Sequence, residues 1–356
     1  MCENKTDLSR KISVLSFVAM VSVVIIHSRA LSGTPASWNV FLQWFITRGL
    51  AKWSVPFFFA VSGYWFGKWV DRQAALSDFW RKKWRTLVLP YLLWAIIGTL
   101  MCLPLICFNN YVTRRPLFYR TVLGHSTIWE CIDNLFGITV HTPEGNAVLW
   151  YVRALLAFFV FAPVWRFARI HVPRLAIMAA VLLVVLPEKF IPYLAICTNW
   201  WGWILVGFLV DKLPLDSTKR NPILLFMGAG YVFSAAIEAG CQAKLIDCCV
   251  WRPVVKQLIP CFGVPFYWAL YDYFPTCTKN FPRWFKWTFW IYCSHAIFTS
   301  YFMAAVFFVI GKTDIILVAV MLTTPIVGVV SSVISAQLVC KFSPTLFKML
   351  TGGRVG

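Results

Sequence analysis

His27 is the residue whose position most strongly suggests chemistry. It ends an uncharged, mostly apolar run at residues 12–27, which follows Arg10 and Lys11. A helix rises about 1.5 Å per residue, so His27 is expected roughly 24 Å beyond Lys11, near the far side of a hydrocarbon core about 30 Å thick. An ionisable group at that depth is costly and is by default a functional candidate. The alternative is a histidine at the membrane boundary with a structural hydrogen bond.

A basic cluster before the third apolar run is the second candidate site. Its four cations are Arg81, Lys82, Lys83 and Arg85. Such side chains can hold the phosphates of a nucleotide-bearing donor by charge-assisted hydrogen bonds. The alternative is a topology signal that also contacts anionic lipid, and the two roles are compatible.

Other ionisable residues fall in or near the apolar runs: Arg48, Lys52, Arg153, Glu238 and His295. Each of them alone can extend its charge to the headgroups. Together they predict a polar cavity inside a helix bundle, because unpaired charges that face lipid are destabilising. Glu238 is a candidate ion-pair partner for Arg153 or Arg48.

A run of aromatic and small residues in the second apolar segment has a structural interpretation. Phe58 and Phe59 stand beside Ser62 and Gly63. The G-x-S-x-G elbow of a nucleophilic serine is missing, so Ser62 is not expected to attack a substrate. The small pair predicts a close helix–helix contact instead.

The composition is that of a membrane protein. Of the 356 residues, 60% are hydrophobic and only 13% are charged, against about 25% charged in soluble proteins. The net charge of +19 comes from basic residues between apolar runs, so it indicates topology rather than a nucleic-acid partner. P-loop, G-x-G-x-x-G, HExxH and CxxC patterns are all missing, so no ATP site, dinucleotide site or metal site is predicted.

The apolar runs predict an all-α bundle of about ten transmembrane helices with both termini in the cytoplasm. They lie at residues 12–28, 49–67, 86–107, 147–165, 175–191, 197–210, 222–240, 254–273, 287–310 and 314–338. This topology places 21 of the Lys and Arg residues on the cytoplasmic side and 12 in outer loops or spans, the asymmetry that the positive-inside rule describes. Residues 1–11 and 339–356 then flank a membrane domain at residues 12–338 as cytoplasmic segments.

Two features belong to the loops of this topology. The connection at residues 108–146 is long and polar, which is typical of a lid, a binding loop or a disordered segment. Four cysteines fall in loops placed outside, where one disulfide can form: Cys131, Cys241, Cys248 and Cys249.

The motifs, in their order, resemble the acyltransferase-3 family of ten-span membrane O-acyltransferases. Along the chain they read VLSFVAMVSVVIIHS, VPFFFAVSGYWF, RKKWRTLVLPYLLW, AVLWYVRALL, GWILVGFLV and FWIYCSHAIF. The family's first-span histidine falls on His27, and its Phe-Phe-x-x-Ser-Gly pattern falls on residues 58–63. Its R-x-x-R element falls on residues 82–85, with lysine first, and its I-Y-x-x-H element on residues 291–295.

The resemblance implies an O-acyltransferase that moves an acyl group, usually acetyl, from acyl-CoA to a hydroxyl of a cell-surface carbohydrate. His27 would act as general base on that hydroxyl or carry the acyl group transiently. The cluster at residues 81–85 would hold the phosphates of acyl-CoA, a co-substrate rather than a tightly bound cofactor. Arg48 and Arg153 would neutralise the developing oxyanion. The expected setting is a cell membrane, as in a bacterial inner membrane, with lipid and carbohydrate as partners.

One departure from the family keeps other functions open. The family's arginine eleven positions before the histidine is Ser16 here, which leaves Arg10, Lys11 or Arg48 as substitutes. The chain is therefore also compatible with an inactive member or a structural subunit. A transporter or flippase of a lipid-linked or anionic sugar would use the same cations to bind rather than react.

Overall fold

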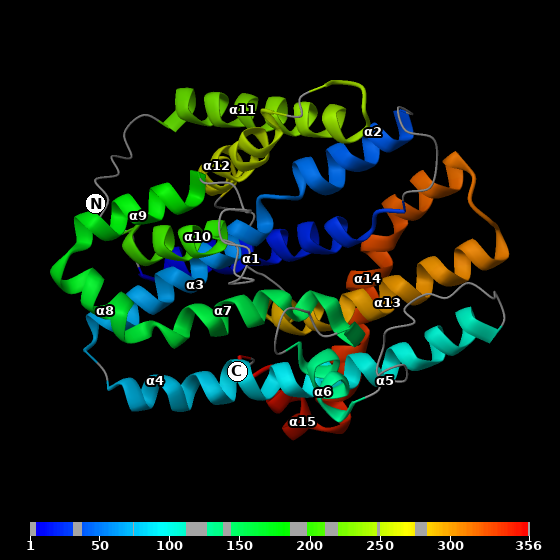
Figure 1. The fold of residues 1–356 in the computed structure, drawn as a ribbon, viewed down its shortest axis with the longest axis horizontal. Helices are drawn as coiled ribbons and strands as arrows, with labels where there is room; N and C mark the ends of the chain where they lie inside the picture. The colour runs from blue at the N-terminus through cyan, green and yellow to red at the C-terminus, as the bar shows by residue number, and fades with distance from the viewer. Residues whose placement is uncertain are drawn as a thin grey trace. The chain divides into compact units, whose positions relative to one another are not determined.

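The computed structural model describes residues 5–30, 38–73, 75–111, 127–137, 144–185, 198–210, 220–247, 250–274 and 283–354 (Figure 1). Within these ranges the regular elements are helices and none is a strand, which confirms the all-α prediction for them. In chain order they are α1 (Lys5–His27), α2 (Trp38–Trp44), η1 (Phe45–Leu50), α3 (Ser54–Asp71), α4 (Leu76–Lys83), η2 (Trp84–Val88), α5 (Leu89–Tyr111), α6 (Ile128–Phe136), η3 (Glu144–Leu149), α7 (Trp150–Val160), α8 (Ala162–His171), α9 (Pro173–Val185), α10 (Thr198–Leu209), α11 (Arg220–Gln242), α12 (Arg252–Tyr271), η8 (Arg283–Trp287), α13 (Thr288–Val309), α14 (Asp314–Phe342) and α15 (Pro344–Leu350).

Several of the described helices can cross a membrane. Five are long and apolar enough: Leu8–His27, Leu76–Leu105, Leu224–Gln242, Trp284–Val309 and Asp314–Phe342. They coincide with the first, third, seventh, ninth and tenth predicted runs. The described parts of the other runs lie on helices that are shorter, bent or less apolar. The chain is therefore a multi-pass membrane protein, and both the count of ten and the cytoplasmic termini stay predictions.

The fourth predicted span, residues 147–165, is bent rather than continuous. Gly145–Val160 and Ala162–His171 meet at an angle of 61°. Pro163 stands in the first turn of α8. Proline is tolerated there because its missing N–H would be unsatisfied anyway, but it cannot continue a preceding helix. If the pair counts as one span, the described part of the chain has six candidates.

Part of the predicted connection at residues 108–146 is helical. α5 continues to Tyr111, and α6 is capped by Thr127, whose Oγ1 accepts a hydrogen bond of 3.2 Å from the Glu130 amide. Gly137 ends α6 in the left-handed conformation (φ 58°) that glycine adopts without strain. α6 packs on α5, so this part of the connection is docked. Residues 112–126 and 138–143 lie outside the described ranges.

Of the four cysteines considered for a disulfide, Cys241 is disulfide-bonded, and it lies in the last turn of α11 rather than in a loop. Cys131 keeps its thiol. Cys248 and Cys249 lie outside the described residues.

The chain folds into two compact units. Unit 1 comprises Met1–Ala74, Phe161–Thr288 and Ile310–Pro325. Within it α3 packs on α10, α11 packs on α12, and α1 contacts both α3 and α12. Its core includes Leu15, Trp53, Tyr231 and Ile259, all at most 3% exposed. This core holds α1, the helix that carries His27.

Unit 2 comprises Ala75–Val160, Phe289–Val309 and Ile326–Gly356. Within it α5 packs against η2, η3, α6 and α15. The Trp94 ring of α5 lies 5.1 Å, centroid to centroid, from Trp290 of α13, and Trp290 lies 5.1 Å from Phe347 of α15. Aromatic pairs contribute more stability than their buried area alone would give. These contacts therefore hold α5, α13 and α15, which are far apart in sequence, together.

Candidate functional site

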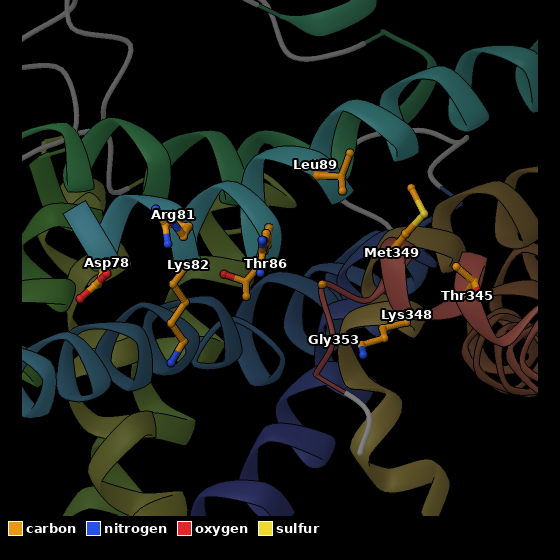
Figure 2. Close-up of a pocket in the computed structure, with 11 residues that line it drawn as sticks. Asp78, Arg81, Lys82, Thr86, Leu89, Thr345, Lys348, Met349 and Gly353 are labelled. Atoms are coloured by element: carbon orange, nitrogen blue, oxygen red, sulfur yellow. The ribbon is translucent and has the colours of Figure 1, made fainter. Parts of the chain in front are cut away.

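An open pocket of about 540 Å³ lies in unit 2 (Figure 2). One wall comes from α4, η2 and the start of α5: Asp78, Arg81, Lys82, Arg85, Thr86 and Leu89. The other comes from α15 and the turn after it: Thr345, Lys348, Met349, Gly352 and Gly353. The lining therefore carries four cations and one carboxylate, and a concave site with that balance attracts anions.

Helical spacing produces the first wall. Asp78, Arg81, Lys82 and Arg85 stand at positions i, i+3, i+4 and i+7, which share one face of a helix. Three of the four cations predicted to hold phosphate therefore point into one pocket.

The fourth predicted cation, Lys83, does not line the pocket. Its Nζ lies 3.8 Å from the centroid of the Phe159 ring and 5.1 Å from that of Phe79. A cation over an aromatic face is stabilised by the ring quadrupole. Lys83 thus packs α4 against α7, and the pocket geometry assigns it no ligand.

Residues 345–353 of the C-terminal segment contribute to this site, although the sequence predicted only a basic tail at residues 339–356. Its first residues complete α14, and α15 packs on α5. The Trp94 Nε1–H donates to the Leu350 carbonyl over 3.0 Å. Lys348 is the pocket cation that sequence reasoning missed, because nothing local in the sequence indicates what the tail contacts.

His27 ends α1 in unit 1 and is half-buried. Just after it, the Arg29 guanidinium lies 4.2 Å from the centroid of the Trp44 ring. Burial, and then repulsion from the nearby charge of Arg48, lowers the pKa of Arg29 to about 10. Arg29 is therefore still cationic at neutral pH. The predicted residue Arg48 thus shares this end of α1 with a second arginine that sequence reasoning passed over, two positions after the candidate histidine.

Glu238 does not pair with either predicted partner in the described structure. It is buried on α11, where its Oε1 accepts a hydrogen bond of 2.8 Å from Gln242. Its Oε2 lies 3.5 Å from the Nε of Arg252 on α12. The pair joins α11 to α12, so Glu238 has a structural role within unit 1.

His295 and Arg153 belong to unit 2. His295 is fully buried on α13, with its Nδ1 2.9 Å from the Ile291 carbonyl. Next to it, Asn146 Nδ2 donates to the Cys293 carbonyl over 2.9 Å. Arg153, on α7, interacts electrostatically with the Tyr91 side chain. The His295 bond lies within α13, and the Asn146 bond joins η3 to α13 beside the I-Y-x-x-H element.

Gly63 makes the close contact that the sequence predicted. A Cβ at this position would collide with the Ile204 backbone carbonyl of α10. Next to it, Phe59 is fully buried and stacks on Trp200, with ring centroids 5.8 Å apart. Phe59 and Gly63 therefore pack α3 against α10 within unit 1.

Lys11, one of the three candidate substitutes for the family arginine that Ser16 replaces, is buried and ion-paired within unit 1. Its Nζ lies 2.7 Å from Asp272 Oδ1 and 4.3 Å from the centroid of the Trp268 ring. Both partners lie at or just after α12. A buried lysine held in this way clamps α1 to that end of unit 1.

The chain is similar to known proteins over nearly its whole length. A family described as an acyltransferase domain matches residues 10–340. The succinoglycan biosynthesis protein ExoH of Rhizobium meliloti (strain 1021) is 23% identical over 375 residues, which covers 98% of this chain and 94% of that protein. No solved structure matches. The family match ends before α15, so one wall of the pocket lies outside it.

Proposed function

The chain belongs to the acyltransferase-3 family, and from this premise we propose that it transfers an acyl group, acetyl first among the candidates, from acyl-CoA to a hydroxyl of a cell-surface carbohydrate. The similar protein takes part in succinoglycan biosynthesis, which supports a polysaccharide acceptor. The proposed location is the cell membrane of a bacterium, because the chain is multi-pass and both donor and acceptor must be reached there.

The observation that carries the donor assignment is the row of Arg81, Lys82 and Arg85 on one face of α4 and η2, lining one pocket. The phosphates of acyl-CoA form a polyanion, and Arg and Lys bind phosphate oxygens through charge-assisted hydrogen bonds. A transporter or flippase of an anionic sugar would use the same cations to bind its cargo, so a transfer assay is needed to separate the two functions.

His27 is the proposed catalytic residue. As general base its ring nitrogen accepts the proton of the acceptor hydroxyl while that oxygen bonds to the thioester carbonyl carbon. The tetrahedral intermediate then collapses with cleavage of the C–S bond, and the proton passes to the departing thiolate. In the relay version the imidazole itself carries the acyl group between donor and acceptor. Arg48 and Arg29 are cations placed at the same end of α1, where an oxyanion gains from them.

The test is transfer of label from acetyl-CoA to surface glycan in membranes that contain wild type, His27→Ala or His171→Ala. His171 lies exposed at the end of α8 and serves as the matched control. We expect transfer by wild type and His171→Ala and its loss in His27→Ala. Equal transfer by His27→Ala refutes the catalytic role. No transfer from any short acyl-CoA by wild type favours transport, or an inactive protein in which Ser16 marks the lost donor site.

A further inference from the structure

The second wall of the pocket is a docked structure and not a loose tail. The Phe347 ring packs at a tilt against Trp290, and the Leu350 carbonyl accepts the indole N–H of Trp94. Thr351 Oγ1 then donates back to the Phe347 carbonyl over 2.7 Å. These contacts hold α15 at a defined place on α5.

The turn that follows α15 is tied to the first wall at Thr86. Gly352 and Gly353 adopt φ of 62° and 69°, which favours glycine. A Cβ on Gly352 would lie 2.7 Å from the Thr86 carbonyl, so only glycine fits there. Arg354 Nη2 donates to the same carbonyl over 2.7 Å, and its guanidinium covers the Phe289 ring at 4.0 Å.

This docking brings an exposed lysine to the basic row. Figure 2 shows Arg81 and Lys82 on one side of Thr86 and Lys348 on the other, beside Gly353. Asp78 is the single carboxylate in the lining. Four cations gathered with one acid repel one another, and a bound polyanion removes that repulsion.

Resting on the proposed function, we propose that the C-terminal segment supplies the second half of a phosphate-binding site, with Lys348 binding phosphate oxygens opposite the α4 row. Its wall begins at Thr345, beyond the residues 10–340 that the family model matches. The occupant is the phosphate-bearing end of acyl-CoA. The phosphate of an anionic lipid is the other source of the same chemistry.

The experiment measures CoA binding calorimetrically with full-length protein in phosphatidylcholine nanodiscs at low salt. We expect Lys348→Gln to weaken CoA binding about fivefold, the loss of one charge-assisted contact made by an exposed cation. Lys341→Gln is the matched control, since this exposed lysine near the end of α14 lies outside the pocket lining, and it should change affinity less than twofold. Gly352→Ala should weaken binding more than Gly353→Ala, because only the first meets the Thr86 carbonyl.

The outcomes separate this inference from the proposed donor. If wild type binds CoA and Arg81→Gln weakens it while Lys348→Gln does not, the C-terminal half-site is refuted and the donor proposal stands. If CoA does not bind but phosphatidylglycerol is retained by wild type and lost in Lys348→Gln, the half-site is supported with a lipid occupant and the acyl-CoA donor fails. If neither ligand responds to Lys348→Gln, the inference is overturned.

Discussion

The side chains at residues 81–85 provide a direct test of the pocket, because three cations line it and one does not. Arg81 and Arg85 are exposed on the pocket face, whereas Lys83 lies over the Phe159 ring. A hydrogen bond to a charged group contributes about 1.5–3 kcal/mol, and solvent screening reduces this to about 1 kcal/mol for an exposed cation. Arg81→Gln and Arg85→Gln should therefore each raise the KM for acetyl-CoA about fivefold.

The double variant should raise KM about 25-fold if each arginine contacts its own phosphate oxygens, since independent losses add. Its KM should also depend less on salt than that of wild type. The matched control is Lys83→Met, which removes a charge but keeps the packing on Phe159. It should leave KM within twofold.

The assay is steady-state transfer of labelled acetyl groups in membrane vesicles at several acetyl-CoA concentrations, with protein levels matched by immunoblot. A KM for Lys83→Met that rises as far as that of Arg81→Gln contradicts the pocket geometry. A fall in kcat with unchanged KM in the arginine variants also contradicts it, because a donor anchor acts on binding.

Three further outcomes follow from the packing of unit 1. Gly63→Ala should destabilise the protein by about 3 kcal/mol or more, because the added Cβ collides with the Ile204 backbone. The variant should therefore not accumulate in membranes, and monodisperse protein at wild-type levels would contradict this. Ser62→Ala should retain transfer activity, because the G-x-S-x-G elbow of a nucleophilic serine is missing around Ser62, and a loss of more than tenfold would contradict that interpretation. Arg169→Gln should lower the free energy of unfolding by about 2 kcal/mol and the melting temperature by several degrees. The buried guanidinium donates to both Asp71 carboxylate oxygens (3.1 and 2.8 Å) and to the Phe208 carbonyl. Because Asp71 is half-exposed, the loss is smaller than for a fully buried ion pair. An unchanged melting temperature would show that the Asp71 contact adds nothing.

Features that depend on local composition could be predicted from the sequence. Apolar runs become helices in a bilayer because every backbone N–H and C=O must be satisfied within the segment. For that reason the all-α class, the multi-pass character and the place of His27 at the end of α1 followed directly. Gly63 was also predictable, because a glycine beside a serine in an apolar helix permits close approach of a neighbour.

Partners that come from distant parts of the chain could not be predicted. The sequence offered Arg153 or Arg48 for Glu238, and the structure pairs it with Arg252. Lys11 likewise forms an ion pair with Asp272, a partner that the sequence did not indicate. Each pairing depends on which helices are neighbours and how they are rotated, and neither is encoded in a local pattern.

By itself, the sequence determined that this is a helical membrane protein with a family-type histidine and a basic cluster, since hydropathy and motif spacing are local properties. Only the tertiary structure decided that Lys83 leaves that cluster to pack on Phe159 and that Lys348 joins it. Residue spacing predicts which side chains share a helix face, but the opposite wall of a pocket depends on which distant segment packs against that helix. Here Phe347 and Leu350 of α15 pack against the tryptophans of α13 and α5, and these contacts place Lys348 at the pocket.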